Sequence, residues 1–250
     1  MANKMPTALI TGASGGIGKA LVKAFAEGGY RVLATDRSGP ADLSESVYYL
    51  SVDLERFVNN VAYADAVISE VMQYIGEQGL DVLINNAAIQ ILGGVDSLQR
   101  DEWKRSLDVN LTAPFFLSQA LLMPLEKVGG SVVNISSIHA KLSKKNFVAY
   151  STSKAALSGL TRSMAVDLGH RVRVNAIEPA AIETPMLVTG FSEHPEHLKE
   201  LADCHPQQRL GTPEEIAALA LAIAQNRFGF MHGACISLDG GIGCRLHDPD

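Results

Sequence analysis

Several features that would assign the chain to other protein classes are scarce or missing. No apolar run approaches the roughly eighteen residues of a membrane-spanning helix, and the longest obvious one is Ala217 to Ala224. The residues before Thr7 are few and polar, which leaves no room for a signal peptide. Cys204, Cys235 and Cys244 show no Cys-x-x-Cys spacing and are too few for a disulfide framework. We therefore expect a cytoplasmic protein.

Positive charge and repetition are also limited. Lys and Arg number 21 against 27 Asp and Glu, and the net charge of −6 argues against nucleic acid as the main partner. The absence of a long apolar run predicts no membrane partner. No internal repeat or low-complexity tract is visible. With 250 residues and 47% hydrophobic content, the chain can bury one large core. We predict a single domain over residues 1–250.

Short apolar runs rich in β-branched residues alternate with helical stretches along the whole chain. Runs that are apolar on both faces indicate a parallel sheet covered on both sides. This pattern predicts a Rossmann-type, doubly wound α/β fold with a seven-stranded parallel sheet and helices on both faces. The predicted strands are Thr7–Thr11, Arg31–Asp36, Tyr48–Val52, Asp81–Asn85, Ser131–Ser136, Arg171–Ile177 and Ala234–Leu238. The predicted helices are Ile17–Glu27, Glu55–Gln78, Arg100–Glu126, Tyr150–Leu168 and Pro213–Gln225, the last with a capping box at Thr212 and Glu215.

A glycine-rich turn follows the first predicted strand and opens the first helix. Glycines allow the backbone to turn tightly and approach a pyrophosphate, which the free N–H groups and the dipole of the helix favour. The turn reads Thr11-Gly12-Ala13-Ser14-Gly15-Gly16-Ile17-Gly18. The predicted cofactor contacts within it are Gly12, Ser14, Gly16, Ile17 and Gly18.

Asp36 ends the second predicted strand, eighteen positions after Gly18. A carboxylate at this spacing hydrogen-bonds the ribose hydroxyls of a dinucleotide and repels a 2′-phosphate. Asp36 therefore favours NAD as the cofactor. NADP stays open as the alternative, because the guanidinium of Arg37 could accept that phosphate.

Tyr150 and Lys154 lie four residues apart, and Ser137 lies thirteen positions before Tyr150. On a helix this spacing puts both side chains on one face, so the ammonium can lower the pKa of the phenol. A phenol beside a fixed cation can exchange a proton with an alcohol. The pair therefore predicts acid/base chemistry.

Asn110 lies inside a predicted long helix, four residues before Pro114. Proline has no N–H to offer the Asn110 carbonyl, so we expect that carbonyl to be free for a water or for Lys154. We also expect the helix to bend there.

Together these motifs resemble those of the short-chain dehydrogenase/reductase family over nearly the whole chain. The matching segments are Thr11–Gly18, Asp53, Asn85–Ala88, Asn110, Asn134–Ser137, Tyr150–Lys154, Asn175–Thr184 and Asp239–Gly241. The resemblance implies that Tyr150 is the general acid/base, and that Lys154 lowers its pKa and binds the nicotinamide ribose. It further implies that Ser137 hydrogen-bonds the substrate oxygen and that Asn110 anchors a proton-relay water.

The resemblance also assigns the rest of the cofactor site. Asp53 and Leu54 are expected to hold the adenine, and Asn86 and Ala87 to flank the ribose. The residues expected to hold the nicotinamide carboxamide are Pro179, Ile182 and Thr184. The chain departs from the family at Ala88 and Ala180, where the family usually has glycine and where a methyl group restricts φ.

Residues 186–208 lie where the family carries a mobile substrate lid. His194, His197 and His205 lie there among acidic residues, but no third ligand is fixed in register, so we expect a solvated surface and no metal site. A basic stretch after Ser137 could steer an anionic substrate. It comprises His139, Lys141, Lys144 and Lys145.

These observations predict an NAD-dependent oxidoreductase that interconverts a small-molecule secondary alcohol and a ketone. Two alternative enzymes are a 3-oxoacyl thioester reductase using NADP and a dehydrogenase of cyclic diols or sugars. A nucleotide-binding sensor is the non-enzyme alternative, although such a protein is expected to lack part of the Ser-Tyr-Lys-Asn set. By family analogy we expect a homotetramer assembled through the two long helices beside the site. Helix residues that could contribute are Phe115, Phe116, Leu157 and Leu160.

Overall fold

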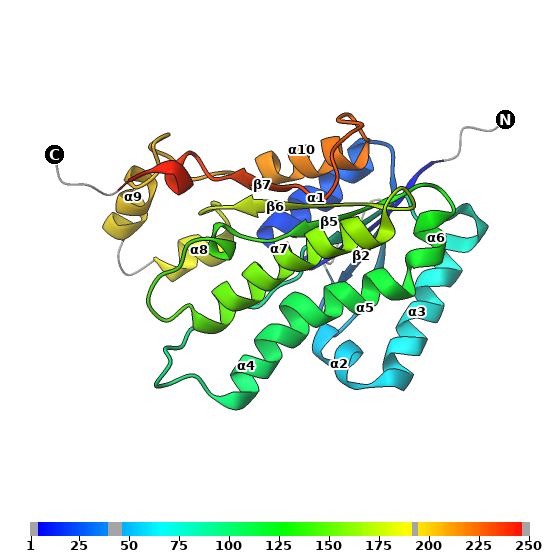
Figure 1. Cartoon of the computed structure of the whole chain (residues 1–250), viewed down its shortest axis with the longest axis horizontal. Coiled ribbons are helices and arrows are strands. Elements are labelled where there is room, and N and C mark those ends of the chain that lie inside the picture. Colours follow the sequence, from blue (N-terminus) through cyan, green and yellow to red (C-terminus); the bar gives the residue numbers. More distant parts are fainter. Residues whose placement is uncertain (1–4, 40–46, 192–194, 247–250) are drawn as a thin grey trace.

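The computed structural model describes residues 5–39, 47–191 and 195–246. Seven parallel strands form one sheet in the order β3-β2-β1-β4-β5-β6-β7 (Figure 1). The order runs outward in both directions from the β1–β4 pair, which confirms the predicted doubly wound sheet. The strands are β1 (Thr7–Thr11), β2 (Arg31–Asp36), β3 (Val47–Ser51), β4 (Val82–Asn85), β5 (Ser131–Ile135), β6 (Arg173–Pro179) and β7 (Cys235–Leu238).

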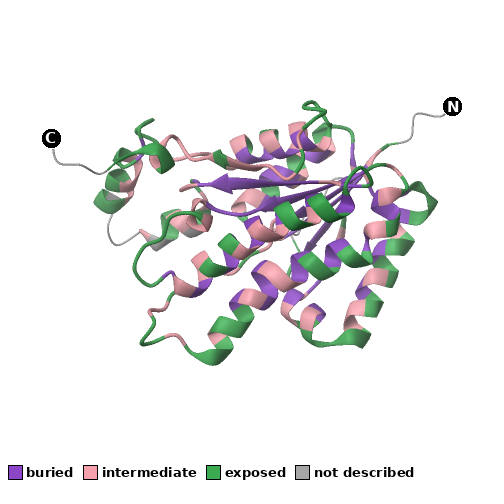
Figure 2. Cartoon of the chain, viewed as in Figure 1, coloured by how far each residue is buried: buried purple, intermediate pink, exposed green. Residues whose placement is uncertain are grey.

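Two hydrophobic cores lie on opposite faces of the sheet. Along β1, Leu9 belongs to one core, and its neighbours Ala8 and Ile10 belong to the other, as the two-residue period of a strand requires. The central strands are buried on both faces (Figure 2). One face is covered by α1 (Gly16–Glu27) and α10 (Pro213–Ala224), which pack together.

The helices between β3 and β6 cover the other face. They are α2 (Leu54–Asn59), α3 (Val61–Ile75), α4 (Arg100–Leu107), α5 (Ala113–Ala120), α6 (Leu122–Glu126) and α7 (Val148–Leu168). The segment expected to form a substrate lid, residues 186–208, overlaps α8 (Pro185–Gly190) and includes α9 (Pro195–Asp203). Single-turn helices are η1 (Gly76–Gln78), η3 (Ile138–Ala140) and η4 (Ile242–Cys244).

Two helices predicted as continuous are interrupted. The predicted helix Glu55–Gln78 breaks at Asn60, which has an extended backbone and caps α3 by accepting the Tyr63 N–H at 2.9 Å. The predicted helix Arg100–Glu126 contains the π-helical turn η2 (Asp108–Thr112) and a further break between α5 and α6. Pro114, in the first turn of α5, explains the π-helical turn η2, because it lacks the N–H that would continue an α-helical ladder.

The start of α10 confirms the predicted capping box. Thr212 Oγ1 accepts the Glu215 N–H at 3.3 Å, and Glu215 Oε2 accepts the Thr212 N–H at 2.8 Å. Hydrogen bonds from Arg209 contribute most to lowering the pKa of Glu215 to about 2. Within the described ranges, no helix is long and apolar enough to cross a membrane.

Candidate active site

The predicted site residues gather at the carboxyl edge of the sheet. The glycine turn follows β1, Asp36 ends β2, Asn86 follows β4 and Ser137 lies two residues beyond β5. Tyr150 and Lys154 lie in the first two turns of α7. In an open α/β sheet this edge is where ligands bind.

The glycine turn is packed too closely for other residues. Gly12 has a φ of +66°, and a Cβ there would lie 2.7 Å from the Cα of Ala87. A Cβ on Gly18 would lie 2.0 Å from the Gly12 oxygen, and one on Gly16 would lie 2.8 Å from Thr184 Cγ2. The turn is therefore pressed against the end of β4 and against the start of α8.

The N-terminus of α1 fits an anionic group. Gly15 caps this helix with no side-chain hydrogen bond, and the first turn contains no acidic residue. Ile17, also predicted to contact the cofactor, is half-buried in that turn. Because N–H groups of a first turn have no partner within the helix, they suit the pyrophosphate of a dinucleotide.

Asp36 is held in place by the glycine turn. Its Oδ2 accepts the Ser14 N–H at 3.0 Å and its Oδ1 accepts the Arg37 N–H at 2.7 Å. Ser14 Oγ in turn donates to the Ser38 carbonyl at 2.6 Å. Each carboxylate oxygen keeps acceptor capacity for a ribose hydroxyl. Arg37 is exposed beside this position.

Asn86 and Thr11 join the glycine turn to the end of β4. The Asn86 side-chain amide donates to the carbonyls of Thr11 (2.8 Å) and Gly12 (3.0 Å). Thr11 Oγ1 accepts the N–H groups of Asn86 and Ala87, both at 3.0 Å. The sequence had not assigned this role to Thr11, although a hydroxyl directly before the glycine turn was a visible signal.

Asp53 and Leu54, expected at the adenine, begin α2. Asp53 Oδ1 accepts the Arg56 N–H at 3.0 Å, so its carboxylate caps the helix. The Asp53 N–H donates to Tyr63 Oη at 3.0 Å, and Leu54 is buried. These contacts fix the backbone that the adenine is expected to meet.

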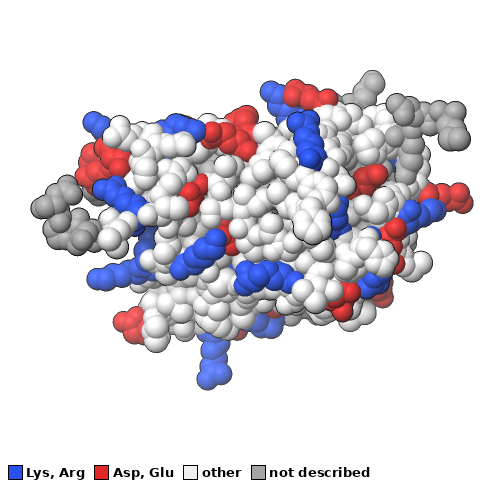
Figure 3. Space-filling view, turned by 45° about the horizontal axis from the view of Figure 1, so that its top comes forward, with Lys and Arg blue, Asp and Glu red and all other residues white. Residues whose placement is uncertain are grey.

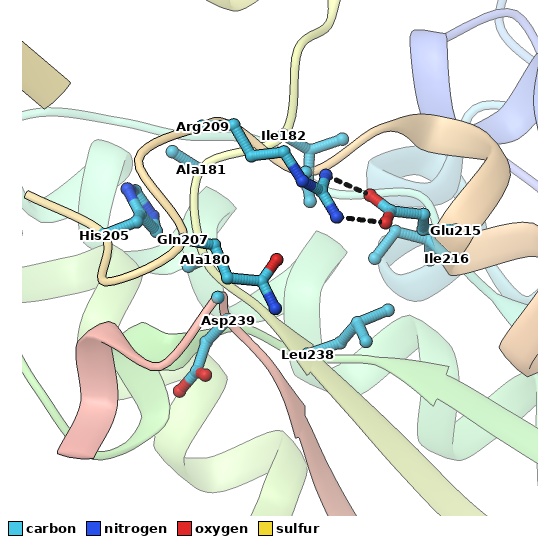
Figure 4. A pocket seen from close by; sticks show the side chains of 12 residues that line it. Ala180, Ala181, Ile182, His205, Gln207, Arg209, Glu215, Ile216, Leu238 and Asp239 are labelled. Carbon is cyan, nitrogen blue, oxygen red and sulfur yellow. Dashed lines mark hydrogen bonds and ion pairs between the residues drawn. The ribbon is translucent and has the colours of Figure 1, made fainter. Parts of the chain in front are cut away.

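Pro179, Ile182 and Thr184 follow one another along the end of β6 and the segment leading to α8. Ile182 pairs with Gly211 in an isolated bridge, and Thr184 caps α8. Ala88 and Ala180 do not have positive φ, so alanine in place of glycine adds no left-handed strain. A cavity of about 100 Å³ lies behind Ala180 and is bordered by the Arg209–Glu215 ion pair (Figure 4).

Tyr150, Ser137 and Lys154 lie together. The Ser137 hydroxyl lies close enough to the Tyr150 phenol to lower its pKa, and it accepts the His139 N–H at 3.1 Å. Lys154 Nζ lies 5.8 Å from the centroid of the Tyr150 ring and donates to the Ile135 carbonyl at 2.8 Å. One helix and the adjoining strand end thus bring a phenol, a hydroxyl and an amine to one point.

Burial governs the protonation of these groups. Burial raises the pKa of Tyr150, and the nearby Ser137 hydroxyl opposes this rise. Burial alone lowers the pKa of Lys154 to about 8. The pKa of Tyr150 is raised because desolvation of the phenol outweighs the effect of Ser137, and a lowering by Lys154 stays a prediction.

The side chain of Asn110, in the π-helical turn, hydrogen-bonds both the N–H and the carbonyl of Ile89. Its Oδ1 accepts the Ile89 N–H at 2.8 Å, and its Nδ2 donates to the Ile89 carbonyl at 2.9 Å and to Ser153 Oγ at 3.0 Å. The Lys154 Nζ bond goes to the Ile135 carbonyl and not to that of Asn110. Asn110 therefore ties the segment after β4 to α7, a role that its place in the sequence did not reveal.

The lid histidines do not share one environment. His205 is buried, with Nδ1 2.8 Å from the Leu201 carbonyl, so the expected solvated surface is wrong for this residue. His197 is exposed, and His194 lies outside the described residues. Across the described part of the chain, no group of three or more His, Cys, Asp or Glu side chains could hold a metal ion.

The basic stretch after Ser137 is partly neutralised. Lys141 forms an ion pair with Glu178 at 2.7 Å, and Lys144 lies over the Phe147 ring. The ring of His139 lies edge-on to Tyr150, and burial lowers its pKa, so His139 is neutral at pH 7. Lys141 and His139 therefore contribute little of the charge expected to steer an anion, whereas no ion pair is formed by Lys144 or Lys145 within the described residues.

Known proteins resemble the chain in sequence and structure. A family model described as enoyl-(acyl carrier protein) reductase matches residues 12–243. A 3-oxoacyl-[acyl-carrier-protein] reductase of Thermotoga maritima is 34% identical over 241 residues, which cover 94% of this chain and 96% of the relative. Ligand-free aldohexose dehydrogenase of Thermoplasma acidophilum aligns with a TM-score of 0.91 at 31% identity, covering 99% of this chain and 97% of that one. ElxO with NADP bound aligns at 0.87 and 26% identity, covering 97% and 100%.

The family model, the curated relative and the solved structures agree over nearly the whole chain. The chain belongs to the short-chain dehydrogenase/reductase family of oxidoreductases.

Proposed function

We propose that the protein is an NAD-dependent oxidoreductase that interconverts a secondary alcohol and a ketone. The observation that carries the proposal is the placement of the Ser137, Tyr150 and Lys154 side chains together, with the glycine turn on the same edge of the sheet. A nicotinamide dinucleotide, when bound, supplies the hydride acceptor or donor. The glycine turn and the ordered Asp36 carboxylate fit the pyrophosphate and ribose of such a group.

Each member of the catalytic set has a distinct role in this proposal. The Ser137 hydroxyl holds the substrate oxygen, and the Tyr150 phenol exchanges a proton with that oxygen as hydride leaves or joins the carbon. Lys154 supplies a buried cation beside the phenol and reaches the nicotinamide ribose. Asn110 keeps the Ile89 segment against α7 and so holds one wall of the crevice.

The raised pKa of Tyr150 gives the reaction a pH dependence. The phenol is protonated at neutral pH and is ready to donate to a ketone. Alcohol oxidation requires its ionised form, whose population grows with pH. We therefore expect oxidation to accelerate as pH rises from 7 to 10, while the proton donor for reduction stays mostly protonated below the raised pKa of Tyr150, and the initial rates of NADH formation and consumption across pH 7–10 measure this.

Cofactor choice rests on Asp36. Its carboxylate is fixed by two backbone N–H groups, and it is expected to repel the 2′-phosphate of NADP. Arg37 and the NADP-bound neighbour ElxO support the NADP alternative.

Replacing the Asp36 carboxylate tests this preference. Asp36→Ala is expected to weaken NADH binding and strengthen NADPH binding, changing their affinity ratio by about tenfold or more, since close charges contribute a kcal/mol or more. Fluorescence titration of both cofactors measures the ratio. Arg37→Ala is the matched control, and a strong wild-type preference for NADPH that Arg37→Ala removes would establish the alternative.

The substrate class is proposed from the crevice and the relatives. Half-buried Ile89 and Ile91 lie in the segment beside Asn110, so a partly apolar alcohol fits. Aldohexose and 3-oxoacyl relatives support two alternatives, a sugar dehydrogenase and a thioester reductase. A screen of secondary alcohols, cyclic diols and sugars with NAD at alkaline pH, and of 3-oxoacyl thioesters with NADPH, separates them. NADH and NADPH binding without turnover of any compound would instead favour a sensor.

A further inference from the structure

Glu178 is a carboxylate buried in β6, next to the proposed active site. Its side chain is 1% exposed. Oε1 accepts a hydrogen bond from Ser158 Oγ at 2.8 Å, and Oε2 pairs with Lys141 Nζ at 2.7 Å. A carboxylate buried so deeply is stable only when it is paired. The ion pair with Glu178 raises the pKa of Lys141, so the lysine is charged at neutral pH.

Lys141 connects Glu178 to the turn that aims Ser137. The turn η3 is closed by two bonds, from the Ala140 N–H to the Ser137 carbonyl (2.9 Å) and from the Lys141 N–H to the Ile138 carbonyl (3.0 Å). Lys141 Nζ also lies 3.4 Å from Ser237 Oγ. Because Lys141 ends this short turn, fixing its side chain on β6 fixes the turn beneath the Ser137 hydroxyl.

A second connection runs from Glu178 through buried hydroxyls. Because Ser158 Oγ donates to Glu178, it can only accept from Ser136 Oγ, which lies 2.9 Å away. The Ser136 hydroxyl also lies 3.0 Å from the Lys154 carbonyl, so its one hydrogen serves both acceptors. Ser136 immediately precedes Ser137, and Ser158 follows Lys154 by one helical turn. Ser136, which adjoins Ser137, and the Lys154 carbonyl therefore both belong to one polar network that includes Glu178.

We propose that Glu178 is a positioning residue. Through Lys141 and Ser158 it holds the η3 turn against β6 and α7, so that the Ser137 hydroxyl stays aligned with Tyr150. The proposal rests on the proposed function only in giving Ser137 and Tyr150 their roles in turnover. It also assigns Lys141 to the architecture of the site and not to substrate attraction.

The two side chains of the Lys141–Glu178 ion pair differ in burial, so removing one or the other should have different effects. Lys141 is 57% exposed, so a lone lysine keeps its hydration after Glu178→Gln. Lys141→Met instead leaves an unpaired carboxylate buried, which is the more damaging change. The double variant removes that orphaned charge and should recover part of what Lys141→Met loses.

The test compares Lys141→Met, Glu178→Gln and the double variant by hydrogen exchange in residues 137–142 and by NADH titration. kcat is measured with the alcohol found in the screen. Glu126→Gln is the matched control, because it breaks the 2.6 Å ion pair with Arg171 near the opposite edge of the sheet. Glu178→Gln keeps the side-chain volume and an acceptor for Ser158, so it carries the test if Lys141→Met does not fold.

The expected result is faster exchange in residues 137–142 and a fall in kcat of about tenfold in Lys141→Met, since small misplacements of reacting groups are costly. A smaller fall in kcat is expected in Glu178→Gln, and the double variant should recover part of the kcat that Lys141→Met loses. In all three variants the NADH affinity should stay within about twofold of that of wild type. Unchanged exchange in the turn, or a double variant no better than Lys141→Met, would overturn the proposal. Hydrogen exchange is measured without substrate. It therefore tests the positioning role of Glu178 even if the proposed function fails.

Discussion

Lys154 keeps a charged amine in surroundings that disfavour charge. It is buried, and its pKa falls to about 8 from the ordinary lysine value of 10.5. The unfolded chain therefore binds more protons than the folded one between these two values, so this group makes stability rise with pH across that window. Below pH 8 the folded protein carries the full cost of the buried charge.

Lys154→Met removes this cost together with the activity. The variant is expected to gain stability relative to wild type at pH 7, and the gain should shrink by about 2–3 kcal/mol as pH rises toward 10.5, where wild-type Lys154 is neutral. Urea unfolding at pH 7, 9 and 10 measures the difference. A difference in unfolding free energy between wild type and Lys154→Met that did not change with pH would show that burial does not lower the pKa of Lys154.

At the scale of elements, the sheet was predictable because its strands are short and apolar on both faces. The strands fell near their predicted places, and β3, β4, β5, β6 and β7 differ from the prediction only at their ends. The interruptions of the predicted helices at Asn60 and Asn110 were harder to predict, because they depend on hydrogen bonds to the backbone that hydrophobic periodicity does not encode. Pro114 indicated a disturbance of the helix, but the contact between Asn110 and Ile89 that it permits joins residues 21 apart and needs the tertiary fold.

The capping box of α10 is a local element whose contribution can be measured. Thr212→Ala removes the acceptor for the Glu215 N–H and should lower the free energy of unfolding by about 1 kcal/mol. Ser69→Ala, at an exposed position of α3, is the control and should change it by less than about 0.5 kcal/mol. Equal effects in urea unfolding would mean that the cap contributes nothing.

At the scale of the whole molecule, the exposed surface favours self-association. Trp103, Phe115, Phe116 and Met123 are exposed on α4, α5 and α6, where apolar groups are costly unless they are covered. Leu157, expected at the interface, is buried within the chain and cannot contribute. Charges of both signs are interspersed on the face shown in Figure 3, so no single-sign field there opposes association.

We propose a homotetramer that buries this apolar face. Sedimentation velocity should give a mass near four times the 26.7 kDa of one chain. Phe116→Lys should shift the mass downward, because it would bury a charge in the contact. Wild-type protein that sediments as a single chain at micromolar concentration would contradict the proposal.

The central claim is that Tyr150 exchanges the substrate proton in a reaction that uses NAD. The most direct test is the rate of NADH formation by wild type and Tyr150→Phe, with NADH binding measured in parallel and Tyr48→Phe, an exposed tyrosine of β3, as control. Loss of an acid/base group predicts a fall of roughly 10²–10⁴-fold in Tyr150→Phe, with NADH still bound and Tyr48→Phe unaffected. Near-normal turnover by Tyr150→Phe would contradict the account.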